Sequence, residues 1–125
     1  MLPVIAGVVP AAVWWPPQGL AIHPETGAVW ANEHGPQGGD ELNILLAGRN
    51  YGWPVASYGR EYGPNGARVS PHPTKEGVEE PIITWFPSIG ISGMTFYTGD
   101  KFPQWKGPHL RRGAFGAGAA PPRVQ

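Results

Sequence analysis

Glycine and proline punctuate this chain so densely that few regular structures can accommodate it. Of its 125 residues, 19 are glycine and 16 are proline, and apolar residues nowhere hold the 3.6-residue period of a helix over three turns. Short apolar runs bounded by Gly, Pro, Asn or Asp recur instead, which is typical of sandwiches, barrels and propellers. Six tryptophans and 41% hydrophobic residues argue against disorder. The sequence therefore predicts an all-β protein.

Five segments are predicted to be strands. The first two would form a hairpin, because Pro24–Gly27 has the residues of a tight turn with glycine at the left-handed position. Residues 58–76 are predicted to be a loop, and loops of this length are usually functional or mobile. The predicted strands cover residues 18–23, 28–32, 41–46, 82–86 and 93–97.

The segment Asn32–Asn43 is the least suited to a hydrophobic core. Its twelve residues include three glycines, a proline, three acids, a histidine and two asparagines. Such a run can form a loop that directs main-chain carbonyls and carboxylates at a cation or a cofactor. An aromatic turn, Asn50–Pro54, begins seven residues after this segment ends.

Together these two segments resemble the signature of the glucose/sorbosone dehydrogenases, the soluble quinoprotein sugar dehydrogenases that use pyrroloquinoline quinone and calcium. The resemblance runs from Pro17 to Gly107, is closest to the aldose sugar dehydrogenase branch, and covers part of a full-length member. Several motifs in the same order make the match specific. The other matching segments are Pro17–Ala21, His23–Gly27, Ser92–Tyr97 and Asp100–Trp105.

The resemblance implies a six-bladed β-propeller as the parent fold, of which this chain would form about one and a half to two blades. Residues 17–107 would be the partial propeller domain, after an atypical apolar segment at residues 1–16. Residues 108–125 are expected to be a low-complexity tail without strand alternation. For this tail we favour a frame-shifted gene over a natural flexible end. Isolated blades would expose the apolar faces that they normally bury against neighbours.

The resemblance also implies ligands for two calcium ions. The Glu41 carboxylate and the Tyr51 main-chain carbonyl would hold a structural calcium, in keeping with the preference of this ion for hard oxygen atoms. Gly35 and Pro36 would offer their carbonyls to the calcium that also binds the quinone oxygens. The ordinary alternatives are a strand-edge glutamate, a core tyrosine and a simple Gly-Pro turn.

Three ring-bearing residues are weaker candidates. Tyr62 loosely matches a cofactor-side tyrosine of the aldose branch, and aromatic stacking is a natural way to hold a planar quinone. Trp53 could line the same cleft or pack in the core. His34 could act as a catalytic base, but a histidine in a polar loop is more typically a hydrogen-bonding residue. The resemblance places the family's base upstream of the matching segment, so no catalytic residue is predicted here.

Two positions depart from the family pattern. Where the family has an Arg-Asn pair directly before Pro17, this chain has Trp15 and Pro16. Neither residue can replace the bidentate fork with which arginine grips carboxylates. We therefore expect a weakened clamp on the cofactor's carboxylates and no sugar oxidation by this chain alone.

Two functions of different classes follow. The first is a fragment of a quinoprotein sugar dehydrogenase, whose parent oxidises an aldose at C1 to a lactone by hydride transfer to the quinone. The second is a non-catalytic calcium-binding β-propeller fragment with a scaffold or interaction role. A propeller lactonase is disfavoured, because its metal cage would need acids from several blades.

Charge and composition exclude other classes. The formal net charge is zero, so nothing indicates nucleic-acid binding. The absence of cysteine excludes disulfides, thiolate metal sites and cysteine nucleophiles. No run approaches the roughly 20 apolar residues that span a membrane. Pro3 and Pro10 interrupt the apolar start, so for residues 1–16 we favour an atypical start of a truncated gene over a cryptic signal peptide. The resemblance implies a periplasmic or secreted location for the family.

Overall fold

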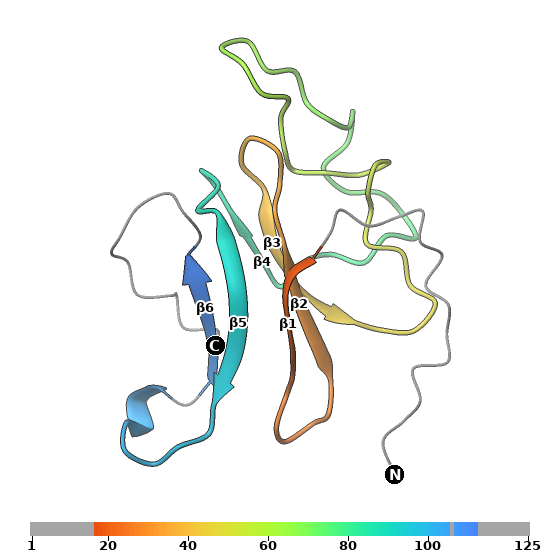
Figure 1. The fold of residues 1–125 in the computed structure, drawn as a ribbon. Coiled ribbons are helices and arrows are strands. Elements are labelled where there is room, and N and C mark those ends of the chain that lie inside the picture. Colours follow the sequence, from red (N-terminus) through yellow and green to blue (C-terminus); the bar gives the residue numbers. More distant parts are fainter. Residues whose placement is uncertain (1–16, 106, 113–125) are drawn as a thin grey trace.

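The computed structural model describes residues 17–105 and 107–112, and within them the protein is all-β (Figure 1). Apart from a short 3-10 helix, η1 (Pro103–Trp105), every regular element in this part of the chain is a strand. The predicted fold class is therefore confirmed. None of the described residues forms a helix that is long and apolar enough to cross a membrane.

Four strands form an antiparallel meander in the order β1-β2-β3-β4, in the centre of Figure 1. This is the strand pattern of a single propeller blade. Gly27, at φ +71°, closes the predicted turn between the first two strands. Each predicted boundary lies within one residue of the observed one. The bounds are β1 Pro17–Ile22, β2 Val29–Glu33, β3 Asp40–Leu45 and β4 Ile83–Trp85.

A second sheet pairs β5 (Ile91–Tyr97) with β6 (Gly107–Arg112) in antiparallel orientation. β5 contains the predicted strand 93–97 and begins two residues earlier. β6 corrects the sequence prediction, which expects a tail without strands from residue 108. The sequence of this segment lacks apolar–polar alternation, but the edge of β5 supplies main-chain hydrogen-bond partners to any sequence that pairs with it.

β5 packs against β1 and β2 and thereby joins the two sheets (Figure 1). Trp30 meets Phe96 edge to face, with ring centroids 5.4 Å apart and an interplanar angle of 87°. The His23 ring contacts both of these rings. Leu42 and Ile91 are fully buried. Aromatic packing and aliphatic burial together fix the position of β5.

The face of the first sheet that points away from β5 carries exposed apolar side chains on β1. Leu20 and Ile22 are each 57% exposed. The register places these residues opposite Ala31 and Val29 of β2. This exposure agrees with the expectation that a blade without its neighbour leaves apolar surface uncovered.

A long connection, residues 46–82, joins β3 to β4 and is drawn in yellow to green in Figure 1. It contains two isolated bridges, Asn50 with Val78 and Arg60 with Arg68, but no helix or strand. The predicted loop at residues 58–76 is therefore confirmed, and it lies beside the loop between β2 and β3.

Candidate functional site

The loop between β2 and β3 holds Gly35 and Pro36 and is tightly wound. A Cβ atom at Gly35 would lie 2.1 Å from the main-chain oxygen of Gly38, so a larger residue does not fit there. Gly38 and Gly39 have left-handed φ angles of +86° and +82°. Gly39 donates its N–H to the Trp85 carbonyl at 2.9 Å. The backbone therefore turns sharply into β3 and is fixed against β4.

The loop that carries Tyr62 packs against the β2–β3 loop. The Gln37 N–H donates to the Arg60 carbonyl at 2.9 Å, and a Cβ atom at Gly59 would lie 2.4 Å from Cδ of Pro36. The Tyr62 side chain is 75% exposed. The structure thus brings together the two loops that hold the predicted quinone-facing residues, and it leaves the tyrosine ring accessible for stacking.

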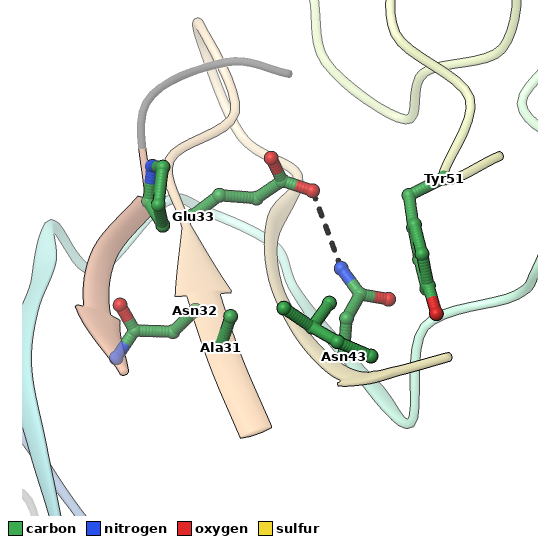
Figure 2. Close-up of a pocket in the computed structure, with 7 residues that line it drawn as sticks. Ala31, Asn32, Glu33, Asn43 and Tyr51 are labelled. Atoms are coloured by element: carbon green, nitrogen blue, oxygen red, sulfur yellow. Dashed lines mark hydrogen bonds between the residues drawn. The ribbon is translucent and has the colours of Figure 1, made fainter. Parts of the chain in front are cut away.

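Glu33 and Glu41 lie opposite each other on paired positions of β2 and β3. Nδ2 of Asn43 donates to both carboxylates, at 3.2 Å to Glu33 and 3.4 Å to Glu41. In the pocket drawn in Figure 2, the Glu33 carboxylate is directed at Asn43, and Tyr51 lies on the far side of that amide. Two acids therefore share one amide donor.

The pKa values of both acids are raised. Burial raises the pKa of Glu33 to about 8, and the nearby Glu41 carboxylate adds to this rise. Burial also raises the pKa of Glu41 to about 7, against the hydrogen bonds from Asn43 and Glu33 and with a contribution from the Glu80 charge. Two buried like charges are costly unless a proton or a cation neutralises them.

Tyr51 lines the same pocket as Glu33 and Asn43 and is 9% exposed. Its hydroxyl accepts the Leu46 N–H at 2.6 Å and donates to the Ile44 carbonyl at 2.9 Å, so the phenol ties the end of β3. Asn43 is 3% exposed, and its Oδ1 has no hydrogen-bond partner. A buried oxygen atom without a donor, beside acids of raised pKa, fits a hard cation such as calcium.

The described residues contain no group of three or more His, Cys, Asp or Glu side chains that could hold a metal ion. The predicted calcium pair has one carboxylate, from Glu41, and one main-chain carbonyl, from Tyr51. A calcium ion there would take its further ligands from amide, main-chain or water oxygen atoms. Calcium at this position is therefore still a prediction.

The remaining candidates have structural surroundings. Nε2 of His34 donates to the main-chain oxygen of Ile91, so the ring ties the β2–β3 loop to β5. Trp53 is partly buried in the long connection. Trp15 and Pro16 lie outside the described residues, together with the rest of the predicted segment 1–16 and residues 113–125 of the predicted tail.

Sequence reasoning missed three polar residues of this region, namely Glu33, Asp40 and Asn43. The feature that would have identified them is the register of the β2–β3 hairpin, which can be used only once the two strands are aligned. Positions 33 and 41 are then directly paired, and position 43 falls on the same face as position 41. Position 40 falls on the opposite face, which packs toward β5.

Comparisons with known proteins agree with the resemblance. The family profile described as Glucose / Sorbosone dehydrogenase matches residues 15–117. An aldose sugar dehydrogenase of Escherichia coli is 50% identical over 93 residues, which cover 72% of this chain and 24% of that enzyme. Quinoprotein glucose dehydrogenase B of Acinetobacter calcoaceticus is 51% identical over 43 residues, which cover 34% of this chain and 9% of the relative.

The fold leads to the same family. The crystal structure of the soluble aldose sugar dehydrogenase from Escherichia coli, in its apo-form, gives a TM-score of 0.71 at 44% identity and covers 77% of this chain and 28% of that chain. The chain thus spans about a quarter of the length of the Escherichia coli enzyme. The prediction of an all-β propeller fragment is confirmed. This chain belongs to the glucose/sorbosone dehydrogenase family.

Proposed function

We propose that this chain is the part of a quinoprotein aldose dehydrogenase that faces the cofactor and its calcium. The parent reaction would oxidise an aldose at C1 to a lactone by hydride transfer to pyrroloquinoline quinone. The observation that carries the proposal is the packing of the Gly35–Pro36 loop against the loop with the exposed Tyr62. The names of two relatives, an aldose sugar dehydrogenase and a quinoprotein glucose dehydrogenase, support this substrate class and cofactor.

Main-chain oxygen atoms and one aromatic ring would hold the cofactor. Gly35 and Pro36 would offer carbonyls to a calcium ion that also binds the quinone oxygens, and the Tyr62 ring would stack on the planar quinone. When bound, the quinone supplies the hydride acceptor, and the cation polarises its carbonyl. The residues of this chain orient the cofactor and restrict the motion of the loop. His34 is assigned a structural role in this scheme, because its Nε2 donates to the Ile91 carbonyl and holds the β2–β3 loop against β5.

A second, structural calcium is proposed at the Glu41 carboxylate and the Tyr51 main-chain carbonyl. Support comes from the raised pKa values of Glu33 and Glu41 and from the unpartnered Oδ1 of the buried Asn43. A divalent cation would offset the repulsion between the two carboxylates and connect β3 to the aromatic turn that follows it. Because this calcium ion would bind the folded chain and not the unfolded chain, it would also stabilise the fold.

The alternative function is a non-catalytic calcium-binding propeller fragment. Trp15 and Pro16 favour it, because they stand where the family has the Arg-Asn pair that grips the cofactor's carboxylates. This alternative keeps the calcium at Glu41 and predicts no binding of the quinone. A periplasmic or secreted location, the expectation for the family, applies to both functions.

Titration of pyrroloquinoline quinone into the purified 125-residue chain, followed by tryptophan fluorescence, separates the two functions. With calcium present, we expect saturable binding that EDTA weakens at least about tenfold, or roughly 1.4 kcal/mol. Tyr62→Ala should weaken binding, whereas Phe102→Ala, which also removes an exposed aromatic ring, should leave it unchanged. Calcium binding without any quinone binding would contradict the dehydrogenase proposal and support the alternative.

A further inference from the structure

Asp40, the first residue of β3, is fully buried, and its carboxylate accepts hydrogen bonds from two loops. Oδ1 accepts the Gly35 N–H at 3.0 Å and the hydroxyl of Ser88. Oδ2 accepts three consecutive main-chain N–H groups. They belong to Ile89 at 3.0 Å, Gly90 at 2.8 Å and Ile91 at 3.3 Å.

The geometry of the β4–β5 connection is adapted to this carboxylate. Gly90 has a left-handed φ angle of +61°, a conformation that lets successive N–H groups converge on one anion. A buried carboxylate is tolerated when hydrogen bonds fill its acceptor positions. The β2–β3 loop and the β4–β5 connection must therefore keep their relative position for Asp40 to stay satisfied.

The β2–β3 loop is the one that presents Gly35 and Pro36. The bond from the Gly35 N–H to Asp40 closes this loop on itself across five residues. The same loop is tied to the Ile91 carbonyl by His34, and Pro36 abuts Gly59. Asp40 is thus the acceptor that connects the Gly35 peptide to the start of β5.

We propose that Asp40 is a positioning residue, whose carboxylate holds the Gly35 and Pro36 carbonyls in place for the calcium that binds the quinone. This inference rests on the proposed function and adds a residue that touches neither the metal nor the cofactor. Its glutamate neighbour Glu41 points to the opposite face of the sheet and belongs to the separate structural calcium site.

The variant Asp40→Asn tests this proposal, because it keeps the size of the side chain but replaces one acceptor oxygen with a donor. By amide hydrogen exchange, we expect Gly35, Ile89 and Gly90 to exchange at least about tenfold faster. The amides of the β2–β3 ladder should stay within about twofold of wild type. In calcium, the dissociation constant for pyrroloquinoline quinone should rise at least about tenfold. General destabilisation would instead raise exchange throughout the sheet and leave the affinity of the folded fraction unchanged.

Two further variants keep the test decisive if Asp40→Asn does not fold. Gly90→Ala retains the carboxylate but strains the left-handed turn, so it should speed Gly35 exchange and weaken quinone binding in the same way. Ser88→Ala removes a single neutral donor and should have a smaller effect in the same direction. Glu76→Gln, at an exposed acid, is the control and should change neither quantity.

The outcomes separate this inference from the proposed function. If the wild-type chain binds no quinone in calcium, the proposed function is contradicted, and the positioning role fails with it. If wild type binds the quinone but folded Asp40→Asn or Gly90→Ala keeps wild-type affinity or wild-type Gly35 exchange, the positioning role alone is overturned. Faster Gly35 exchange together with weaker quinone binding supports it.

Discussion

Replacing Gly59 with alanine should force apart the two loops of the candidate site. Gly59 is buried, and an added Cβ atom would lie 2.4 Å from Cδ of Pro36 and 3.2 Å from the Gly38 oxygen. Carbon atoms in contact prefer about 3.5–4.0 Å, so the new methyl group would overlap the proline by about 1 Å. A proline ring has no rotamer that would relieve this overlap, and the backbone must move instead.

Gly93→Ala in β5 is the matched control. No atom lies within 4 Å of a Cβ atom built at Gly93, so the added methyl group meets open space. Both substitutions remove the same conformational freedom of glycine from the unfolded chain, which by itself stabilises a protein by about 0.4–1 kcal/mol. The difference between the two variants therefore isolates the overpacking at Gly59, for which we expect about 1–3 kcal/mol.

Equilibrium unfolding in urea, followed by tryptophan fluorescence, gives the free energy of unfolding of each variant. We expect Gly59→Ala to unfold at lower urea concentration than wild type and Gly93→Ala to unfold at the same or a higher concentration. Gly59→Ala should also bind pyrroloquinoline quinone more weakly, because Pro36 shifts. Free energies of unfolding that agree within about 0.5 kcal/mol would show that the two loops do not pack as described.

Three further predictions concern calcium and turnover. Tyr51→Phe should lower the free energy of unfolding by about 1–3 kcal/mol, because two main-chain groups lose their hydrogen-bond partner. It should change calcium affinity less than about twofold, since the proposed ligand is the main-chain carbonyl. A large loss of calcium affinity in calorimetry would instead show that the hydroxyl is a ligand. Removing calcium with EDTA should lower the melting temperature measured by circular dichroism, and an unchanged value would argue against a structural ion. In a dye-reduction assay with quinone, calcium and aldoses, the chain should show no turnover, because Trp15 and Pro16 replace the Arg-Asn pair. Turnover near that of a full-length relative would contradict this prediction and make His34 the leading candidate for the catalytic base.

The strands of the first sheet could be predicted because local chemistry delimits them. Gly27 adopts the left-handed conformation predicted for the first turn, and Gly48, also left-handed, follows the end of β3. Nothing local specifies β6, since Gly107 and Pro108 do not favour a strand. That strand depends on the edge of β5, which becomes available only through tertiary packing.

The candidate site was predictable to the extent that it lies within one motif. Gly35, Pro36 and Glu41 belong to one short segment, and Tyr51 and Tyr62 follow at spacings that the resemblance supplies. The acid pair could not be foreseen, because Glu33 and Glu41 meet only through the hairpin register. The role of Asp40 could not be predicted either, since the groups that donate to its Oδ2 lie about fifty residues away in the sequence.

Calorimetric titration of calcium into the 125-residue chain tests most directly the proposal that the Glu41 carboxylate and the Tyr51 main-chain carbonyl hold a calcium ion. We predict that wild type binds calcium and that Glu41→Gln binds it at least about tenfold more weakly, or roughly 1.4 kcal/mol. Glu76→Gln, at an exposed acid, should bind like wild type. A calcium affinity that is the same in wild type and Glu41→Gln would remove Glu41 from the ligands and contradict the account.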